Sequence, residues 1–177
     1  MRVSVLAAGA LSAALLALPA GAATNPKAKA ESAPKQTTAQ TRTTGWVAQC
    51  SSKARGATPD CAVTERIVLA QTGQMVAGIT IRVPSDTRKP VLMLQAPLGL
   101  YLPPGMSLTI GKNKPVTVPL QTCDNNGCYA GQPVSDAVLK QFRSAESLSL
   151  KFQNVNRQDV TITVPLKGFS KAYDQVK

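Results

Sequence analysis

The stretch that decides the fold runs from Gln95 to Gly131 and has the sequence QAPLGLYLPPGMSLTIGKNKPVTVPLQTCDNNGCYAG. Within it, Leu108 and Ile110 alternate with Ser107 and Thr109, which is the period of two expected of a strand with one buried face. The runs Pro103-Pro104-Gly105 and 111–115 are turn sequences that separate one strand from the next. The stretch therefore predicts three short strands, at 99–102, 106–110 and 116–120.

The sequence on both sides of this stretch carries the same pattern. Apolar and β-branched residues at 61–71 and 75–83 flank a turn at 72–74 and predict a β-hairpin. Residues 91–95 follow as a further strand, and the alternating runs 148–152 and 160–166 predict a closing hairpin. We expect Trp46, the only tryptophan, to anchor the core at the start of the first strand.

One segment departs from the period of two. Residues 132–143 place Val138, Leu139 and Phe142 on one helical face, with Ser135 as a helix N-cap and Asp136 in the first turn. Many short strands with one short helix predict an all-β fold, an immunoglobulin-like β-sandwich in preference to a distorted barrel. A chain of 177 residues leaves room for one such domain, which we place at residues 45–177.

The first 44 residues have a different composition. Arg2, the apolar run Val3–Leu18 and the small residues Ala20-Gly21-Ala22 predict a secretory signal peptide at 1–22, with no transmembrane span left after cleavage. An uncleaved membrane anchor is the alternative. Residues 23–44 are rich in Ala, Thr, Lys, Gln and Pro, and we expect a disordered linker there. These features predict export to the periplasm, to the medium or to the outer-membrane surface.

Composition restricts the possible chemistry. The chain has no histidine, which removes Ser-His-Asp and Cys-His catalysis and imidazole metal sites. Aromatic residues make up 4%, too few for a platform that stacks sugars or single-stranded nucleic acid. No Ser-x-x-Lys motif of the β-lactamase type and no spaced set of carboxylates appear in the predicted domain. We therefore predict a protein that is not an enzyme, with no catalytic residues, no metal site, no cofactor and no specific nucleic-acid partner.

The four cysteines favour two disulfides, because exported chains fold in oxidising compartments. Four cysteines allow three pairings, and the favoured one joins Cys50 to Cys61 and Cys123 to Cys128, each closing a polar loop. A zinc site would need tighter spacing in the first pair, and a redox pair would need two intervening residues in the second.

The net charge of +11 indicates an anionic partner surface, although in many exported proteins such charge serves solubility alone. Two predicted turns concentrate it, and their residues are the first candidates for contact with an anionic partner: Arg88, Lys89, Lys112 and Lys114.

Taken together, the ordered motifs resemble the invasion-associated locus B family. They are Gly45-Trp46 with Cys50, Cys61, the run 96–106, Cys123 with Cys128, and the closing run 164–173. The resemblance covers about residues 45–174 and implies a secreted or periplasmic protein of Gram-negative bacteria with an immunoglobulin-like β-sandwich. Founding members of that family are linked to invasion of host cells, notably erythrocytes, and no catalytic residues carry over. Gly111-Lys112 stands where the family often has Asp, which makes this loop more basic.

The sequence thus predicts a non-enzymatic exported interaction protein that binds an anionic surface or a protein partner and supports host-cell invasion or envelope function. The alternative is a structural or chaperone-like envelope module that acts through an exposed sheet edge. A long edge strand without Lys or Pro would favour that alternative.

Overall fold

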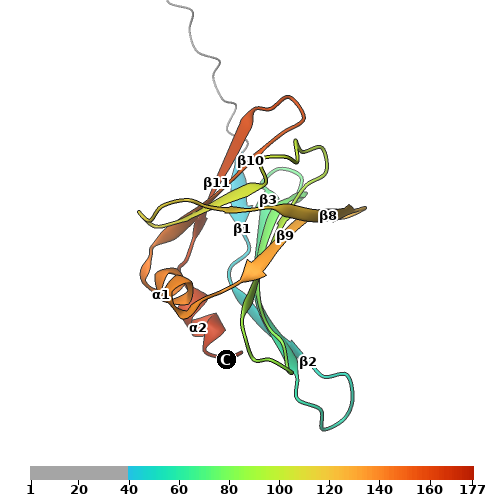
Figure 1. Ribbon diagram of the computed structural model, residues 1–177, viewed down its shortest axis with the longest axis vertical. Helices are drawn as coiled ribbons and strands as arrows, with labels where there is room; N and C mark the ends of the chain where they lie inside the picture. The colour runs from blue at the N-terminus through green and yellow to red at the C-terminus, as the bar shows by residue number, and fades with distance from the viewer. Residues whose placement is uncertain (1–39) are drawn as a thin grey trace, which may run out of the picture. The chain divides into compact units, whose positions relative to one another are not determined.

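The computed structural model describes residues 40–177, which form two antiparallel β-sheets and two short helices (Figure 1). The larger sheet has seven strands in the order β1-β3-β4-β5-β9-β8, with β2 also paired to β3. The smaller has four strands in the order β11-β10-β6-β7. The strands of the larger sheet are β1 (Thr41–Thr43), β2 (Val47–Ser51), β3 (Asp60–Leu69), β4 (Met75–Val83), β5 (Val91–Ala96), β8 (Leu120–Asp124) and β9 (Gly127–Pro133). Those of the smaller are β6 (Met106–Ile110), β7 (Val116–Val118), β10 (Ser147–Gln153) and β11 (Asp159–Pro165).

The core lies between the two sheets and is mainly aliphatic, as the low aromatic content requires. Alternate residues of each strand face inward, so that β5 buries Leu92, Leu94 and Ala96 while β10 buries Leu148 and Leu150. Residues from both sheets form one continuous hydrophobic cluster. Two separate sheets that share one core make a β-sandwich, so the predicted fold class is confirmed and the barrel alternative is wrong.

One edge of the larger sheet is a strand broken in the middle. β1 pairs with the second half of β3 and β2 with the first half, and Thr44–Trp46 make the break between them. The Glu65 carboxylate, 1% exposed, accepts the N–H groups of Thr44 and Gly45, each at 2.8 Å. The Thr44 N–H also donates to the Arg66 carbonyl at 3.0 Å, whereas the Gly45 N–H has only the Glu65 carboxylate as its acceptor. A buried charge is tolerated here because it accepts these backbone donors at the break in the strand.

The helices cover the end of the sandwich at which β5 begins. α1 (Asp136–Ser144) starts at Ser135, whose hydroxyl accepts the Val138 N–H, as the sequence predicted. α2 (Phe169–Tyr173) is a second helix of five residues, where the sequence predicted only one helix. Among residues 40–177, no helix is long and apolar enough to cross a membrane.

Several sequence expectations need correction. Residues 99–102 are not a strand, because only Leu100 makes an isolated bridge, to Asn154. The strand expected at 116–120 is divided at Pro119, which lacks an N–H; β7 stays in the small sheet and β8 joins the large one. β1 lies inside the linker expected at 23–44, so ordered structure begins before residue 45. The predicted hairpin at 61–71 and 75–83 is confirmed as β3 and β4.

Both disulfides join residues that face each other across adjacent antiparallel strands. Cys50 pairs with Cys61 between β2 and β3, and Cys123 with Cys128 between β8 and β9. This is the pairing that the sequence favoured, and each cysteine lies in a strand beside the loop that its disulfide closes. The expected signal peptide at 1–22 and residues 23–39 of the expected linker lie outside the described residues.

Candidate functional site

Arg88 and Lys89 lie in the turn between β4 and β5 with exposed side chains. The Arg88 N–H donates to the Pro84 carbonyl at 3.0 Å, and the Arg88 backbone has a φ of +54°. The turn is tied to the residues before α1, because the Val134 N–H donates to the Pro90 carbonyl at 2.9 Å. These two basic residues therefore stand near the beginning of the helix.

Lys112 and Lys114 lie in the turn between β6 and β7, also exposed. Asn113 closes this turn, since its backbone N–H and its side-chain Nδ2 both donate to the Ile110 carbonyl, at 3.1 and 2.8 Å. At Gly111, an added Cβ would lie 3.2 Å from the Cβ of Ala145, the residue that follows α1. The second pair of basic residues therefore stands near the end of the same helix.

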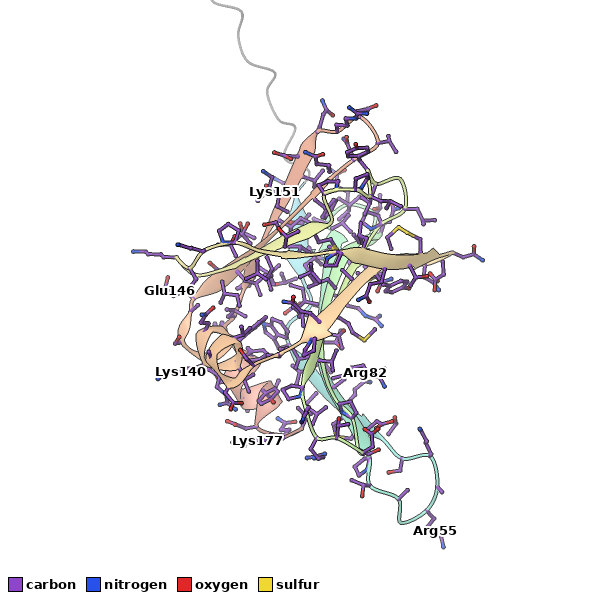
Figure 2. The ribbon with its side chains drawn as sticks, in the orientation of Figure 1. Arg55, Arg82, Lys140, Glu146, Lys151 and Lys177 are labelled. Carbon is purple, nitrogen blue, oxygen red and sulfur yellow. A yellow bond between two sulfur atoms is a disulfide. The ribbon has the colours of Figure 1, made fainter. Side chains whose placement is uncertain are left out.

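α1 connects the two pairs and adds a fifth cation. Its nine residues span about 13 Å at 1.5 Å per residue. Phe142 is buried, and Lys140 is exposed and points away from the sheets in Figure 2. We call the set Arg88, Lys89, Lys112, Lys114 and Lys140 the basic surface. Lys140 was absent from the sequence candidates, although the helical pattern that places Val138 and Phe142 inward indicates which residues face solvent.

An aromatic cluster holds this end of the domain in place. Phe169 of α2 contacts Trp46, Phe142 and Tyr173, with ring centroids 4.9, 5.1 and 5.7 Å apart. Trp46 also donates its Nε1–H to the Pro165 carbonyl at 3.0 Å, which links the two sheets. The predicted role of Trp46 as a core anchor thus extends to fixing α2, and through Phe142 it fixes α1.

Acidic residues neutralise only part of the charge around the helices. Asp174 forms ion pairs with Arg143 at 2.7 Å and with Lys177 at 2.8 Å, and these hydrogen bonds lower the pKa of its carboxyl to about 2. Burial raises the pKa of the Tyr173 hydroxyl, while the positive charges of Arg143, Lys177 and Arg88 act against that rise. Within residues 40–177, no member of the basic surface forms an ion pair, so its five charges remain available to a partner.

The other candidate groups have structural explanations. In the part of the chain that the structure describes, no three His, Cys, Asp or Glu residues gather as metal ligands. Asp124 accepts the Asn126 N–H at 2.7 Å and the Tyr129 hydroxyl at 3.2 Å, which makes it a turn residue. An open hollow of about 550 Å³ lies on the outer face of β5, β8 and β9. Its lining is uncharged: Val91, Met93, Gln121, Thr122, Tyr129, Ala130, Gly131, Gln132 and Pro133.

Comparisons with known proteins agree with this architecture. The family model of the invasion associated locus B (IalB) protein matches residues 46–177. Two invasion protein B homologues of Brucella abortus, from strains 2308 and 9-941, are each 27% identical over 133 residues, which is 75% of this chain and 75% of theirs. The crystal structure of invasion associated protein B from Bartonella henselae superposes with a TM-score of 0.64 at 19% identity, over 77% of this chain and 94% of that one.

The structural match supports the sandwich fold, and the family model covers the whole domain from Trp46 onward, including both turns of the basic surface. The chain belongs to the invasion associated locus B family.

Proposed function

We propose that this protein is an exported, non-enzymatic interaction protein that binds an anionic surface polymer through the basic surface around α1. The two curated relatives are named invasion protein B homologues, and two disulfides suit a protein that folds outside the cytoplasm. In this proposal, binding to an acidic surface polymer is the step by which the protein supports invasion or envelope function.

One observation carries the proposal. Lys112 and Lys114 follow Arg88 and Lys89 by more than twenty residues, yet the two turns stand at the two ends of one nine-residue helix. Charges arranged in this way, with Lys140 between them, present one positively charged face to a polyanion. Because all five side chains are exposed, their attraction is long-ranged and screened by salt.

The test is salt-dependent retention on immobilised heparin, used as a model polyanion. Residues 38–177 form a compact unit, so this segment is used for every variant. The variant R88Q/K89Q/K112Q/K114Q should elute at a clearly lower salt concentration than the wild type. The matched control R42Q/K53Q/R55Q/R66Q removes the same number of charges from exposed positions on β1, β3 and the β2–β3 loop, whose tip carries Arg55 in Figure 2.

The difference in retention between the two variants shows whether the position of the charges matters or only their number. If both lose the same retention, only net charge matters and the basic surface is not a site. If the wild type shows no salt-dependent retention at all, the electrostatic proposal is wrong.

A second candidate function is strand capture by the free edge of β11. The edge strand has seven residues with no Lys, and its only Pro is the last residue. The Pro165 carbonyl accepts a hydrogen bond from Trp46 and therefore faces away from β10. In an antiparallel pair, the backbone groups of every second residue face the same side, so the N–H and C=O groups of Thr161 and Thr163 also face away from β10. These open groups could pair with an extended segment of another protein.

Suppression of aggregation of a chemically unfolded client protein tests this candidate. Wild-type protein should lower light scattering, and T161K/T163K should lose that effect because lysines protect an edge from pairing. Equal suppression by the variant, or none by the wild type, would count against strand capture.

A further inference from the structure

The exposed hydrophobic residues of the described chain are unevenly distributed. Five large ones are substantially exposed, and three of them belong to two neighbouring loops: Leu98 (55%), Leu102 (46%) and Val155 (64%). The other two, Val47 and Val116, lie on β2 and β7. Scattered single residues of this kind are normal on a protein surface, whereas a cluster on loops indicates an interaction site.

The two loops are joined by backbone hydrogen bonds. The Val155 N–H donates to the Gly99 carbonyl at 3.1 Å, and the Tyr101 N–H donates to the Gln153 carbonyl at 2.9 Å. These bonds flank the bridge between Leu100 and Asn154. We call the surface formed by Leu98, Tyr101, Leu102 and Val155 the apolar tip, while the half-buried Leu100 packs against the core. Its residues are held together before any partner binds, so little ordering entropy opposes binding.

Five of the nine residues from Pro97 to Gly105 offer no free backbone N–H. Pro97, Pro103 and Pro104 have no N–H, and the N–H groups of Tyr101 and Gly105 are bonded to carbonyls within the protein. From Pro97 to Gly105 the sequence has no charged or amide side chain. An unpaired backbone donor is costly in a lipid environment, so removing or pairing five of nine donors makes contact with a lipid surface less costly for this loop.

The rim of the tip has the amphipathic character of a membrane interface. The Arg157 guanidinium lies over the Tyr101 ring, 4.8 Å from its centroid. Tyrosine favours the boundary between headgroups and acyl chains, and an arginine beside it can reach a lipid phosphate while its aliphatic part stays on apolar surface.

The apolar tip is separate from the basic surface. β5 begins just after Arg88 and Lys89 and ends just before Leu98, and its six residues extend about 20 Å. In Figure 1 the turn between β10 and β11 lies at the upper end of the sandwich, whereas α1 and α2 lie in the lower half. The two surfaces can therefore be tested independently.

From these observations we infer that the apolar tip inserts into the boundary between headgroups and acyl chains of a lipid bilayer. Leu98, Leu102 and Val155 enter the apolar layer, and Tyr101 and Arg157 remain at the level of the headgroups. This inference goes beyond the proposed function, because neither the basic surface nor its polyanion takes part.

The first test is flotation with phosphatidylcholine vesicles containing phosphatidylglycerol, at physiological salt, using residues 38–177 so that the apolar run 3–18 is absent. L98S/L102S/V155S should lower the vesicle partition coefficient by about tenfold or more, from the apolar area that it removes. The matched control V47S/V116S changes the two exposed valines outside the tip and should bind as the wild type does. Equal loss in both variants, or no binding by the wild type, would overturn the inference.

The second test reports the depth of insertion and does not depend on affinity differences. A tryptophan placed by L102W should have its added fluorescence quenched by vesicles with brominated acyl chains, whereas one placed by V116W should not. The variant R88Q/K89Q/K112Q/K114Q with L102W should still be quenched, even if heparin retention fails. Absence of quenching in L102W would overturn the inference. A tip variant that alters only self-association in gel filtration would show that the tip binds a second copy of the protein and not lipid.

Discussion

Glu65 is the one buried charged residue among the described positions, and its role is to support the backbone of a broken edge strand. E65A should destabilise the fold by about 1–3 kcal/mol, because the Gly45 N–H would lose its acceptor and the Thr44 N–H would keep only the Arg66 carbonyl. E65Q should cost less, since Oε1 accepts both of these N–H groups and an amide retains one oxygen. Urea unfolding of both variants at neutral pH checks this order. Equal loss in E65A and E65Q would mean that the charge, and not the acceptor, matters.

Gly105 closes the loop of the apolar tip with a backbone that few other residues could adopt. Its φ is +69°, and an added Cβ would lie 2.7 Å from the Val118 carbonyl oxygen. Gly73, with a φ of +70°, has nothing within 4 Å of the same position, so G73A isolates the cost of backbone strain. G105A should therefore lose about 1–3 kcal/mol more than G73A, as measured by urea unfolding. Similar losses in the two variants would show that the loop shifts to relieve the contact.

At this scale, the sequence predicted residues whose role depends on local spacing. The cysteine pairing followed from two polar loops, and the Ser135 cap followed from the start of a helical pattern. Glu65 and Lys140 were missed for a different reason. Glu65 accepts hydrogen bonds from residues about twenty positions away in the sequence. Lys140 becomes a candidate only because the fold places two distant basic turns at the two ends of α1.

At the scale of elements, each disulfide fixes one edge strand of the larger sheet to its neighbour. Removing either as a pair of serines should lower stability, by about 3 kcal/mol for C50S/C61S and about 2 kcal/mol for C123S/C128S. The order follows from the sequence separations of 11 and 5 residues, because the longer loop loses more chain entropy when it is closed. Thermal and urea unfolding of the two double variants check it. A reversed order would point to native packing at β8 as the larger contribution.

Strands with regular alternation were predictable, and elements that depend on long-range pairing were not. β3, β4, β6 and β10 each have one apolar face, which their sequences display directly. Residues 99–102 are also apolar, yet they make only the bridge from Leu100 to Asn154, because the prolines at 97, 103 and 104 stop a ladder from extending on either side. β9 was not anticipated, since Gly127, Gly131 and Pro133 have low strand propensity and only pairing with β5 and β8 makes it a strand.

For the domain as a whole, the carboxyl groups act on stability in opposite directions. Hydrogen bonds to backbone, to side chains or to basic partners lower the pKa of Asp60, Asp159 and Asp174. Burial raises the pKa of Glu65 despite the hydrogen bonds that it accepts. A lowered pKa favours folding above the pKa of the unfolded chain, and a raised one favours folding below it. Replacing one of the three aspartates should therefore change the pH dependence of stability in the opposite direction from replacing Glu65.

Asp174 gives the sharpest test, because it joins α1, α2 and Lys177 in one network. Its folded pKa of about 2 lies below the ordinary value of 3.8, so its contribution is present above about pH 4 and is lost as the pH falls toward 2. D174N should lower the free energy of unfolding at pH 7 and flatten its decline between pH 4 and 2. Both effects should be smaller than the pKa shift alone implies, because the Asp174 side chain is 48% exposed and solvent screens its ion pairs. E65Q should instead remove a decline that begins as the pH rises above 4.5. Urea unfolding from pH 2 to 7 separates the two effects, with E146Q as the control for an exposed carboxylate outside the ion pairs. A D174N profile parallel to that of the wild type would show that the network around the helices contributes nothing to acid stability.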